Sequence, residues 1–415
     1  MNGAAGSMMR VAVITMAYPA VAESFLAVEL RALMSQGVAL SVYALRTRPP
    51  DAKVRAVEMG ISDIQASWYT WQTPLSALIM LLAHPLRVAR TILWTVRSRP
   101  TTVLLAIRCA ALLPRLLEVA REIEKGDSDV VHLFWGHYPT IAAYYLRQWD
   151  RRRRVVTMSL GAYDLLYRFG PSVAFSKWAD AIWTHTAANI PLLQDRGVDT
   201  RRVSVLHRGI DLSMIPAMAP ANNREPGLIV TVARLVPEKG VALVIRAVAM
   251  LKFRRVPCRL VIVGDGPERE ALESLSRELG CPDAIQFCGW LSQRDVYATL
   301  ARADVFALLS TNPSERLPNV VKEALASGCI CIVTETPGIR ELLQDLERPM
   351  IVDADATAAA EAIEAVIRLG SEFAVDRVRG RCNMIAHFDS TAVARARIDV
   401  WKRLLARPHL TVDAR

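Results

Sequence analysis

The sequence lacks several features that would assign it to other classes of protein. Its seven cysteines form no CxxC pair and have no regular spacing, which argues against a zinc site and a disulfide framework. Residues 1–9, MNGAAGSMM, have neither a basic n-region nor an apolar h-region, so we expect no signal peptide. No segment reaches the roughly 18 uncharged apolar residues that a membrane span requires. We therefore expect a cytoplasmic protein.

Acidic residues are scarce in the first half of the chain. Residues 1–216 hold 25 Lys and Arg against 16 Asp and Glu, whereas the whole chain has a net charge of +10. Nearly all of the positive excess therefore lies in the N-terminal half, and this half is expected to meet any acidic partner. The basic run at 151–154 lacks interleaved aromatic residues for base stacking, so we do not expect nucleic acid as a partner.

A segment from about Leu75 to Leu117 combines long apolar runs with scattered arginines. The arginines are Arg87, Arg90, Arg97, Arg99, Arg108 and Arg115. Helices that are apolar on one side and bear arginine on the other can lie on an anionic bilayer. The alternative is that these helices simply pack on the sheet of their domain, and the sequence leaves both interpretations open.

Both halves of the chain alternate short apolar runs with longer amphipathic ones, which predicts parallel sheets covered by helices. With 415 residues, two domains are expected. The first half is predicted to contain strands at Arg10–Met16, Val38–Leu45, Asp129–Phe134, Arg154–Ser159, Asp180–His185 and Val203–His207. The second half is predicted to contain strands at Leu228–Ala233, Arg259–Val263, Ala284–Cys288, Asp304–Leu309 and Cys329–Thr334. The predicted fold class is α/β, with two doubly wound domains whose strand ends surround a shared cleft.

The stretch PAMAPANNREPG, which ends at Gly227, is rich in Pro, Ala and Asn and is interpreted as a linker. This interpretation gives an N-terminal domain of residues 1–216, a linker of 217–227 and a second domain of 228–386. The final segment, 387–415, contains a run from Ser390 to Ala406 with helical periodicity.

One motif, NPSERLPNVVKEALASG at 312–328, places Glu315 and Glu323 eight positions apart. Pro318 suits the first position of a helix and Gly328 suits the left-handed residue that closes one, so we predict a helix from about Pro318 to Ser327. The unpaired N–H groups at its start, together with the helix dipole, would attract an anion. Carboxylates on both sides of such an anion-binding site indicate a ligand with central phosphates and hydroxyls at both ends, which describes a nucleotide sugar. Taken without this context, the two glutamates could instead be capping and solvent-facing residues.

Two cations precede this motif. In VARLVPEKG, Arg234 follows a predicted strand and Lys239 comes directly before a predicted helix, a position from which both can neutralise a diphosphate. By itself Lys239 could equally begin an exposed helix. The nearby VIVGDGPE is a poor dinucleotide fingerprint, because Arg269 replaces the third glycine and Asp265 would repel a pyrophosphate.

Taken together, VARLVPEKG, LVIVGDGPERE, FCGWLSQRDVYATLARADVFALLS and PSERLPNVVKEALASG resemble, in order and spacing, the donor domain of the retaining glycosyltransferases of family 4, which have the GT-B fold. The resemblance is dense over residues 227–343. In the first half, RVAVITMAYPAVAESFLAVELRALMSQGVALSVYALR resembles the subgroup that builds bacterial exopolysaccharides and other surface glycans.

The resemblance implies a role for each matching donor residue. Glu323 would accept hydrogen bonds from the ribose diol, and Glu315 would contact the hydroxyls of the transferred sugar. Arg234 and Lys239 would bind the donor diphosphate. The donor-binding set implied by the family motifs also includes Gly264, Leu317, Pro318, Asn319 and Val320. The family works without a bound metal ion or other cofactor, and no DxD triad stands at a predicted strand end here.

In the first domain the resemblance is less specific. The segment DVVHLFWGHYPT contains the end of a predicted strand and the loop that follows it. Family members often have a histidine just past this strand, and either His132 or His137 could occupy that place. We favour His137, which lies further into the loop and joins Glu315, Arg234 and Lys239 as a candidate catalytic residue. SLGAYD lacks the histidine of the corresponding family loop but leaves Asp164 as an acceptor-side candidate.

Two positions depart from the family pattern. Arg316 replaces the common glycine after Glu315, and Arg208 replaces an asparagine, so Arg208 receives no role.

The expected function is retaining transfer of a hexose from a UDP- or GDP-sugar to a lipid-linked or surface polysaccharide. The protein would act as a peripheral protein on the inner face of the plasma membrane, with a nucleotide sugar, a glycan or glycolipid and an anionic membrane as partners. The alternative is a non-catalytic module that binds nucleotide sugars and serves as a partner or regulator.

Overall fold

The computed structural model describes residues 8–20, 24–99, 102–149, 152, 154–161, 164, 169–218 and 224–407. The chain divides into two compact units. Unit 1 comprises Met1–Gly209 and Ser390–Arg415, and unit 2 comprises Ile210–Asp389.

These boundaries differ from those read from the sequence. The first division falls after residue 209 instead of 216, and the last falls after residue 389 instead of 386. The segment 217–227, interpreted as a linker, lies within unit 2. Residues 219–223 of that segment lie outside the described residues, and Glu225 already begins a strand. Local composition misplaced the division, since Pro and Asn also occur in loops that lead into a strand.

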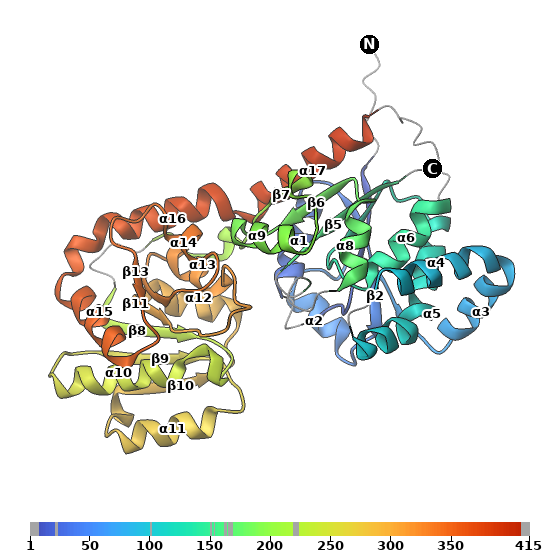
Figure 1. Ribbon diagram of the computed structural model, residues 1–415. Helices are drawn as coiled ribbons and strands as arrows, with labels where there is room; N and C mark the ends of the chain where they lie inside the picture. The colour runs from blue at the N-terminus through green and yellow to red at the C-terminus, as the bar shows by residue number, and fades with distance from the viewer. Residues whose placement is uncertain are drawn as a thin grey trace, which may run out of the picture. The chain divides into compact units, whose positions relative to one another are not determined.

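Unit 1 is built on a seven-stranded parallel sheet with the strand order β3-β2-β1-β4-β5-β6-β7 (Figure 1). Its strands are β1 (Arg10–Thr15), β2 (Ala39–Thr47), β3 (Gln65–Tyr69), β4 (Val130–Leu133), β5 (Val155–Ser159), β6 (Ala181–Thr184) and β7 (Val203–Val205). Its α-helices are α1 (Ser24–Ser35), α2 (Ala52–Glu58), α3 (Thr73–Ala83), α4 (Pro85–Arg97), α5 (Val103–Lys125), α6 (Pro139–Trp149), α8 (Gly170–Ser176), α9 (Ile190–Asp195) and α17 (Ser390–Leu405).

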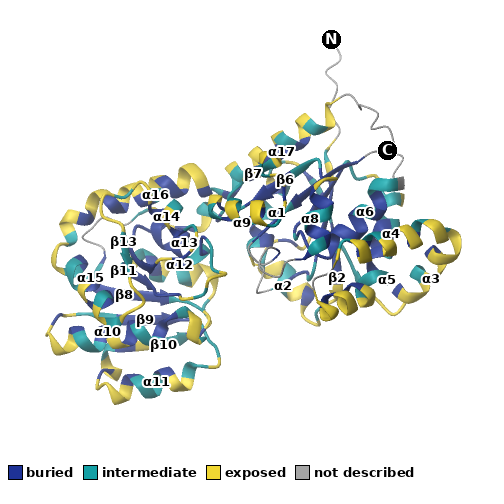
Figure 2. Ribbon diagram, viewed as in Figure 1, coloured by how far each residue is buried: buried dark blue, intermediate teal, exposed yellow. Residues whose placement is uncertain are grey.

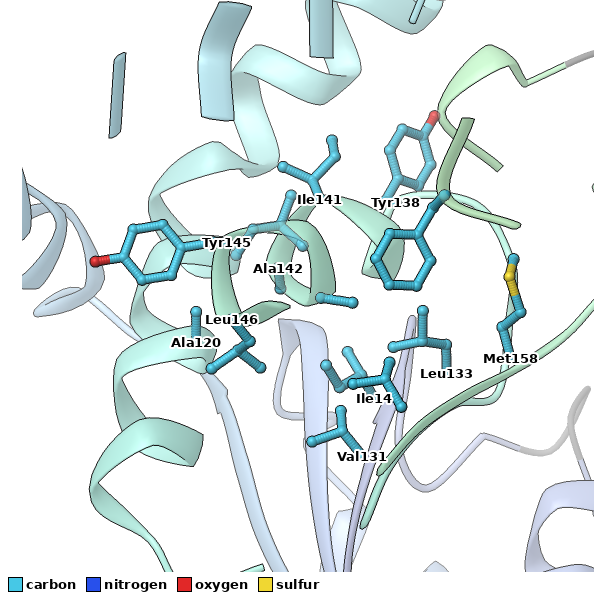
Figure 3. Close-up of a cluster of buried hydrophobic side chains, with 14 of the residues drawn as sticks. Ile14, Ala120, Val131, Leu133, Tyr138, Ile141, Ala142, Tyr145, Leu146 and Met158 are labelled. Atoms are coloured by element: carbon cyan, nitrogen blue, oxygen red, sulfur yellow. The ribbon is translucent and has the colours of Figure 1, made fainter. Parts of the chain in front are cut away.

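The central strands of unit 1 are buried on both faces, which explains their continuous apolar runs. On one face, Ile14, Val131 and Leu133 point toward α6 and the middle of α5 (Figure 3). On the other face, Val11 and Val13 belong to a core cluster that includes residues of α1 and α17. Helix α17 covers almost the whole run in which the sequence showed helical periodicity, and it belongs to unit 1.

Unit 2 is built on a six-stranded parallel sheet with the order β10-β9-β8-β11-β12-β13. Its strands are β8 (Glu225–Val232), β9 (Arg259–Val263), β10 (Ile285–Gly289), β11 (Ala303–Leu308), β12 (Ile330–Thr334) and β13 (Met350–Val352). Its α-helices are α10 (Val241–Phe253), α11 (Arg269–Glu278), α12 (Gln293–Arg302), α13 (Asn319–Ala326), α14 (Ile339–Leu343), α15 (Ala356–Arg368) and α16 (Ala374–Phe388). One face of the sheet packs against α10 and α15, and the other packs against α12, α13 and α16.

Candidate functional site

The strand order of unit 2 reverses between β8 and β11, the two central strands of its sheet. In doubly wound parallel sheets, ligands bind at such a reversal, beyond the carboxyl ends of the strands. Arg234 follows the end of β8 by two residues, and the loop 309–318 connects the end of β11 to α13. The sequence-predicted donor residues therefore lie where the topology of the sheet places a ligand.

Lys239 and Glu315 form an ion pair at this position. Lys239 Nζ lies 2.6 Å from Glu315 Oε1 and 2.7 Å from Oε2. The two side chains are 23% and 12% exposed, so the pair is largely shielded yet reachable from solvent. Ser310 Oγ lies 2.6 Å from Glu315 Oε2 and 3.0 Å from the carbonyl oxygen of Glu238, and its single proton serves one of these acceptors.

Gly240 allows the two loops that carry this ion pair to approach each other. Its φ is +67°, in the left-handed region that glycine adopts without strain. A Cβ atom at this position would lie 2.1 Å from the carbonyl oxygen of Leu309, a distance that no side chain could accept. The glycine after Lys239 is therefore required for the packing that brings Lys239 to Glu315.

Arg234 is exposed, and among the described residues its side chain has no hydrogen bond or ion pair. A guanidinium presents a planar fork of donors that matches phosphate oxygens. Arg234 can therefore bind an anionic ligand without first breaking an internal contact.

The start of α13 supplies further donors. The sequence predicted Pro318 as the first residue of this helix. In the structure Pro318 is instead the N-cap residue, and the helix begins at Asn319. Among the hydrogen bonds of the described residues, the backbone N–H groups of Leu317, Asn319 and Val320 have no acceptor. Leu317 has a φ of +50°, a strained value for a branched residue, and its side chain is buried in the core. The loop before α13 thus leaves three backbone N–H groups without an acceptor among the described residues at the helix N-terminus.

Glu323 lies on α13, within hydrogen-bond reach of Tyr297. Tyr297 Oη donates to Glu323 Oε1 over 3.5 Å, a long contact. Burial raises the pKa of Glu323 from 4.5 to about 7, while Lys322 and the Tyr297 hydroxyl act in the opposite direction. Glu323 is therefore partly protonated near neutral pH, and an incoming pair of hydroxyls would favour its ionised form.

Gly264 contributes to the site through its lack of a side chain. Its N–H donates to the carbonyl oxygen of Gly289 over 2.8 Å, so it does not offer a free donor to a ligand. With a φ of +123°, any Cβ would lie 2.0 Å from the carbonyl oxygen of Ala233. Gly264 keeps the turn after β9 against the end of β8, beside Arg234.

Arg316, the departure from the family pattern, is half-buried in the same loop. Its Nη1 donates to the carbonyl oxygen of Pro313 over 3.0 Å. Its buried Nε has no acceptor among the described residues. Burial lowers the pKa of Arg316 from its usual value. The loop next to Glu315 therefore carries a second, incompletely paired cation.

In unit 1 both candidate histidines are neutral and engaged. His132, on β4, is fully buried, with Nδ1 3.0 Å from Thr157 Oγ1 and Nε2 2.8 Å from Arg397 Nη1. Since Arg397 can only donate, Nε2 accepts and the ring proton resides on Nδ1. Burial, reinforced by Arg397, lowers the pKa of His132 well below its usual value. These contacts bind His132 into the internal structure of unit 1.

His137 lies in the loop after β4 and is 9% exposed. Its Nδ1 accepts the N–H of Tyr138 over 2.9 Å, and its ring stacks on Trp135. Burial and the charge of Arg46 lower its pKa to about 3. His137 is neutral at physiological pH, so it can offer an Nε2–H but not a positive charge.

Asp164 is 2% exposed and accepts the N–H of Gly161 at Oδ2 over 2.9 Å. Burial raises its pKa to about 7, although the Gly161 N–H and Arg208 favour its ionised form. Asp164 and Arg208 thus belong to one electrostatic neighbourhood within unit 1.

Two further residues of these regions received no role from the sequence. Arg208 lies over the rings of Phe25 and Trp135, with its Cζ 4.4 Å and 5.0 Å from their centroids. It also lines a small pocket of unit 1 with Glu29 and Arg397. In the sequence, the only feature that distinguished Arg208 was that it replaces an asparagine common in the family. Ser310 had no sequence signal, because a serine after a buried strand is common.

Two further findings concern metal ions and membranes. Within the described residues, no group of three or more His, Cys, Asp or Glu side chains is arranged to hold a metal ion. No single helix of the described chain is long and apolar enough to span a membrane. The pair α3 and α4, bent by 108° at their junction, passes that test only when both helices are taken together.

Comparisons with known proteins agree with this organisation. The family model for glycosyl transferases group 1 matches residues 218–377. A lipopolysaccharide core biosynthesis glycosyltransferase of Rhizobium meliloti is 33% identical over 192 residues, which cover 46% of this chain and 51% of that protein. A GDP-mannose-dependent phosphatidylinositol dimannoside mannosyltransferase of Mycobacterium tuberculosis is 31% identical over 291 residues, covering 65% and 70% of the two chains. The chain spans about half the length of the first curated relatives it matches.

Among solved structures, Anabaena HepE in complex with UDP-glucose superposes with a TM-score of 0.69 over 95% of this chain and 100% of its own, at 15% sequence identity. At this identity the likeness concerns the fold alone. It extends to both units of the chain, each with its parallel sheet.

Proposed function

The chain belongs to the group 1 glycosyltransferases and has the GT-B fold, and on this premise we propose that it moves a hexose from a nucleoside diphosphate sugar to a glycan acceptor with retention of the anomeric configuration. The observation that supports the proposal is that Arg234, the Lys239–Glu315 pair and the start of α13 all follow the carboxyl ends of β8 and β11, the two strands at which the sheet order of unit 2 reverses.

Each part of this cluster matches one part of a nucleotide sugar. Arg234 and the N–H groups at the start of α13 would bind the diphosphate, and Lys239 would add a second cation. Glu323 would accept hydrogen bonds from the ribose diol. Glu315 would do the same for the hydroxyls of the sugar.

The Lys239–Glu315 ion pair stabilises both charged side chains in the protein without a donor. In the absence of a donor, each neutralises the other in a partly buried position. When a donor binds, phosphate oxygens can replace the carboxylate beside Lys239 while sugar hydroxyls replace the ammonium beside Glu315. The site is therefore arranged before binding, which reduces the reorganisation needed during the reaction.

Retention requires that the new glycosidic bond forms on the face from which the nucleotide leaves. In the proposed reaction the bond from the anomeric carbon to the phosphate oxygen breaks, and the acceptor oxygen bonds to that carbon. The acceptor proton passes to a phosphate oxygen of the leaving group. The protein then acts through positioning and through stabilisation of the leaving diphosphate, and needs neither a separate nucleophile nor a metal ion.

We propose a lipid-linked or surface polysaccharide as the acceptor, reached from the cytoplasmic face of the membrane. The named relatives support this class, since one acts in lipopolysaccharide core biosynthesis and another on a phosphatidylinositol mannoside. The acceptor side would involve His137 and Asp164. His137 would act as a neutral donor there, since its pKa is far below 7.

A panel of donors tests the proposal. The purified protein is melted with UDP, GDP and their sugars, with and without a chelator, and the donors that raise the Tm are then assayed for hydrolysis and transfer. UDP-glucuronate is included because Arg316 adds a cation beside the sugar position. Stabilisation by one nucleotide family, with turnover that survives the chelator, is expected. If no nucleotide raises the Tm, the assignment of the donor site is wrong. If a nucleotide binds without turnover, the protein is a non-catalytic binding module.

A further inference from the structure

A long stretch of unit 1 contains no acidic residue. Between Asp63 and Glu118 the chain has no Asp or Glu, yet it has six arginines. This stretch holds β3, α3, α4 and the first half of α5. Such complete separation of charge is unusual in a globular surface, where both signs are normally interspersed.

Helix α3 exposes apolar side chains along one stripe. Leu75, Leu78, Ile79 and Leu82 follow helical spacing and are 57%, 50%, 43% and 74% exposed. The same helix is anchored on its other side, where Met80 is buried in the core. The exposed stripe is therefore in addition to the face that the fold requires.

Helix α4 and the start of α5 continue this surface. On α4, Leu86 and Val96 are 76% and 64% exposed, and the opposite side is held by Val88 in the core. On α5, Val103 and Ile107 are 78% and 59% exposed, before the helix enters the core. Figure 2 shows α3 and α4 with exposed residues along their outer sides. We call the surface of residues 71–99 and 102–108 the apolar face.

The helices that carry the apolar face are fixed to unit 1. Trp94 of α4 stacks on Tyr144 of α6, with ring centroids 4.1 Å apart. Thr73 Oγ1 donates to Glu118 over 2.8 Å. The exposure of the apolar face is therefore a property of the folded unit and not of a loose segment.

The arginines divide into two groups. Arg115 is buried and pairs with Glu118 and Glu122, so the sequence-based expectation that it contributes to a basic outer side is wrong. Arg87 is paired with Glu124. The remaining arginines, which are exposed, are Arg90, Arg97, Arg99 and Arg108. They lie on or beside the helices of the apolar face, where their long side chains can reach lipid phosphates while their stems stay among apolar groups.

We propose that the apolar face docks on an anionic lipid bilayer, with α3 and α4 lying at the level of the headgroups. Because this stretch carries arginines and no acidic residue, its charge is complementary to that of an anionic lipid bilayer. A surface that binds another protein commonly carries both acidic and basic residues. No single described helix is both long and apolar enough to span a membrane, and the 108° bend between α3 and α4 suits helices in the interface plane. The proposal gives the lipid-linked acceptor of the proposed function a surface on which to meet the enzyme, and it rests on that function only in this respect.

Vesicle flotation tests this surface directly. The full chain is floated with vesicles of phosphatidylcholine alone, and with vesicles containing about one third phosphatidylglycerol, at low and at high salt. We expect binding to the anionic vesicles that weakens with salt. The double variant Leu82→Asp with Leu86→Asp should reduce the bound fraction about tenfold or more, since it removes two apolar side chains and adds charge of the wrong sign. The variant Arg97→Gln with Arg108→Gln should bind less and show a weaker dependence on salt.

A matched control is available in unit 2. Phe253 is 90% exposed at the end of α10, outside the apolar face, so Phe253→Asp should float as the wild type does. Equal binding of the Leu82 and Leu86 variant and the wild type would overturn the proposal. So would a wild-type dimer that this variant abolishes, because the occupant would then be a second copy. Donor hydrolysis in the absence of vesicles is measured in parallel, so that loss of membrane binding is distinguished from failure of the proposed function.

Discussion

At the scale of single residues, the donor site depends on an ion pair that serves two purposes. Lys239 and Glu315 form an ion pair in the protein, and we propose that each has a different partner when a donor is bound. Removing one member should therefore affect catalysis more than folding, because the site is partly open to solvent and the remaining charge can be hydrated.

Glu315→Gln is the sharpest test of this arrangement. The amide keeps the shape of the side chain and its contact with Ser310, but it cannot balance Lys239 or orient sugar hydroxyls as strongly. Turnover is expected to fall by about 10² or more, with the Tm nearly unchanged. The control is Glu335→Gln, which removes an exposed pair with Arg340 in the same unit and should leave turnover unaffected. Full turnover in Glu315→Gln would show that this carboxylate has no part in the reaction.

Glu323 gives the donor site a dependence on pH. Its pKa is about 7 in the folded protein and 4.5 without the fold. The folded state therefore binds more protons, and the free energy of unfolding decreases as the pH rises from about 4.5 to about 7. Glu323→Gln removes this contribution, so the variant should gain stability relative to the wild type as the pH rises from about 4.5 to about 7.

Nucleotide affinity should change in the opposite sense, because in the proposed donor site only the ionised Glu323 carboxylate could accept from both ribose hydroxyls. Wild-type affinity for the preferred nucleotide is expected to rise through pH 7, whereas that of Glu323→Gln should stay flat. Urea unfolding and calorimetric titration at several pH values measure the two quantities. Asp164, whose pKa is also about 7, remains in both proteins and cancels from the comparison. Parallel stability curves would contradict the assignment.

At the scale of elements, the sequence predicted the central strands well and missed two at the edges. Both β3 and β13 lie at an edge of their sheet, and their residues are only partly buried or exposed. A strand buried on both faces needs a continuous apolar run, whereas an edge strand does not, so QASWY carried no comparable signal. Helix α13 was predicted to within one residue at each end, because Pro318 and Gly328 are local signals.

The contacts of α17 could not be predicted, since they join residues far apart in the chain. Arg397 is 3% exposed and pairs with Glu29 of α1, while its Nη1 also reaches His132. Helical periodicity alone gives no reason for a buried arginine. The same network explains why His132, which looked like a site residue at a strand end, is occupied within unit 1.

Arg397→Met should destabilise unit 1 by about 3 kcal/mol, because it leaves Glu29 without its charge partner in a largely buried position. Arg395→Met is the matched control, as Arg395 is exposed on α17 and, among the described residues, hydrogen-bonds to Gln36 alone. Urea unfolding followed by tryptophan fluorescence, to which the buried Trp401 and Trp183 of unit 1 contribute, measures both. A loss no larger than that of Arg395→Met would mean that the buried pair contributes little.

At the scale of the whole molecule, the sequence identified two parallel-sheet domains but not where they divide. Only a few residues determine where the two units divide, and their contacts join positions that are far apart in the sequence. Arg224 is 6% exposed and donates to the carbonyl oxygens of Ala303 and Ser327, so it belongs to unit 2 although the sequence placed it in a linker. Ile210 and Phe388 likewise lie in a core cluster of unit 2. None of these contacts leaves a local pattern.

The two sets of boundaries make different predictions for an isolated fragment. Residues 210–389 retain Arg224, Ile210, Phe388 and the complete donor cluster, so this fragment should fold and be stabilised by the nucleotide that the full chain prefers. Residues 228–386 lose those three side chains and the start of β8, which leaves the Ala303 and Ser327 carbonyls without donors and opens a cavity in the core. We expect this shorter fragment to be unfolded or markedly less stable in urea. Since the longer fragment lacks unit 1, it should bind nucleotide without transferring sugar, and transfer by it would place the acceptor site wholly within unit 2.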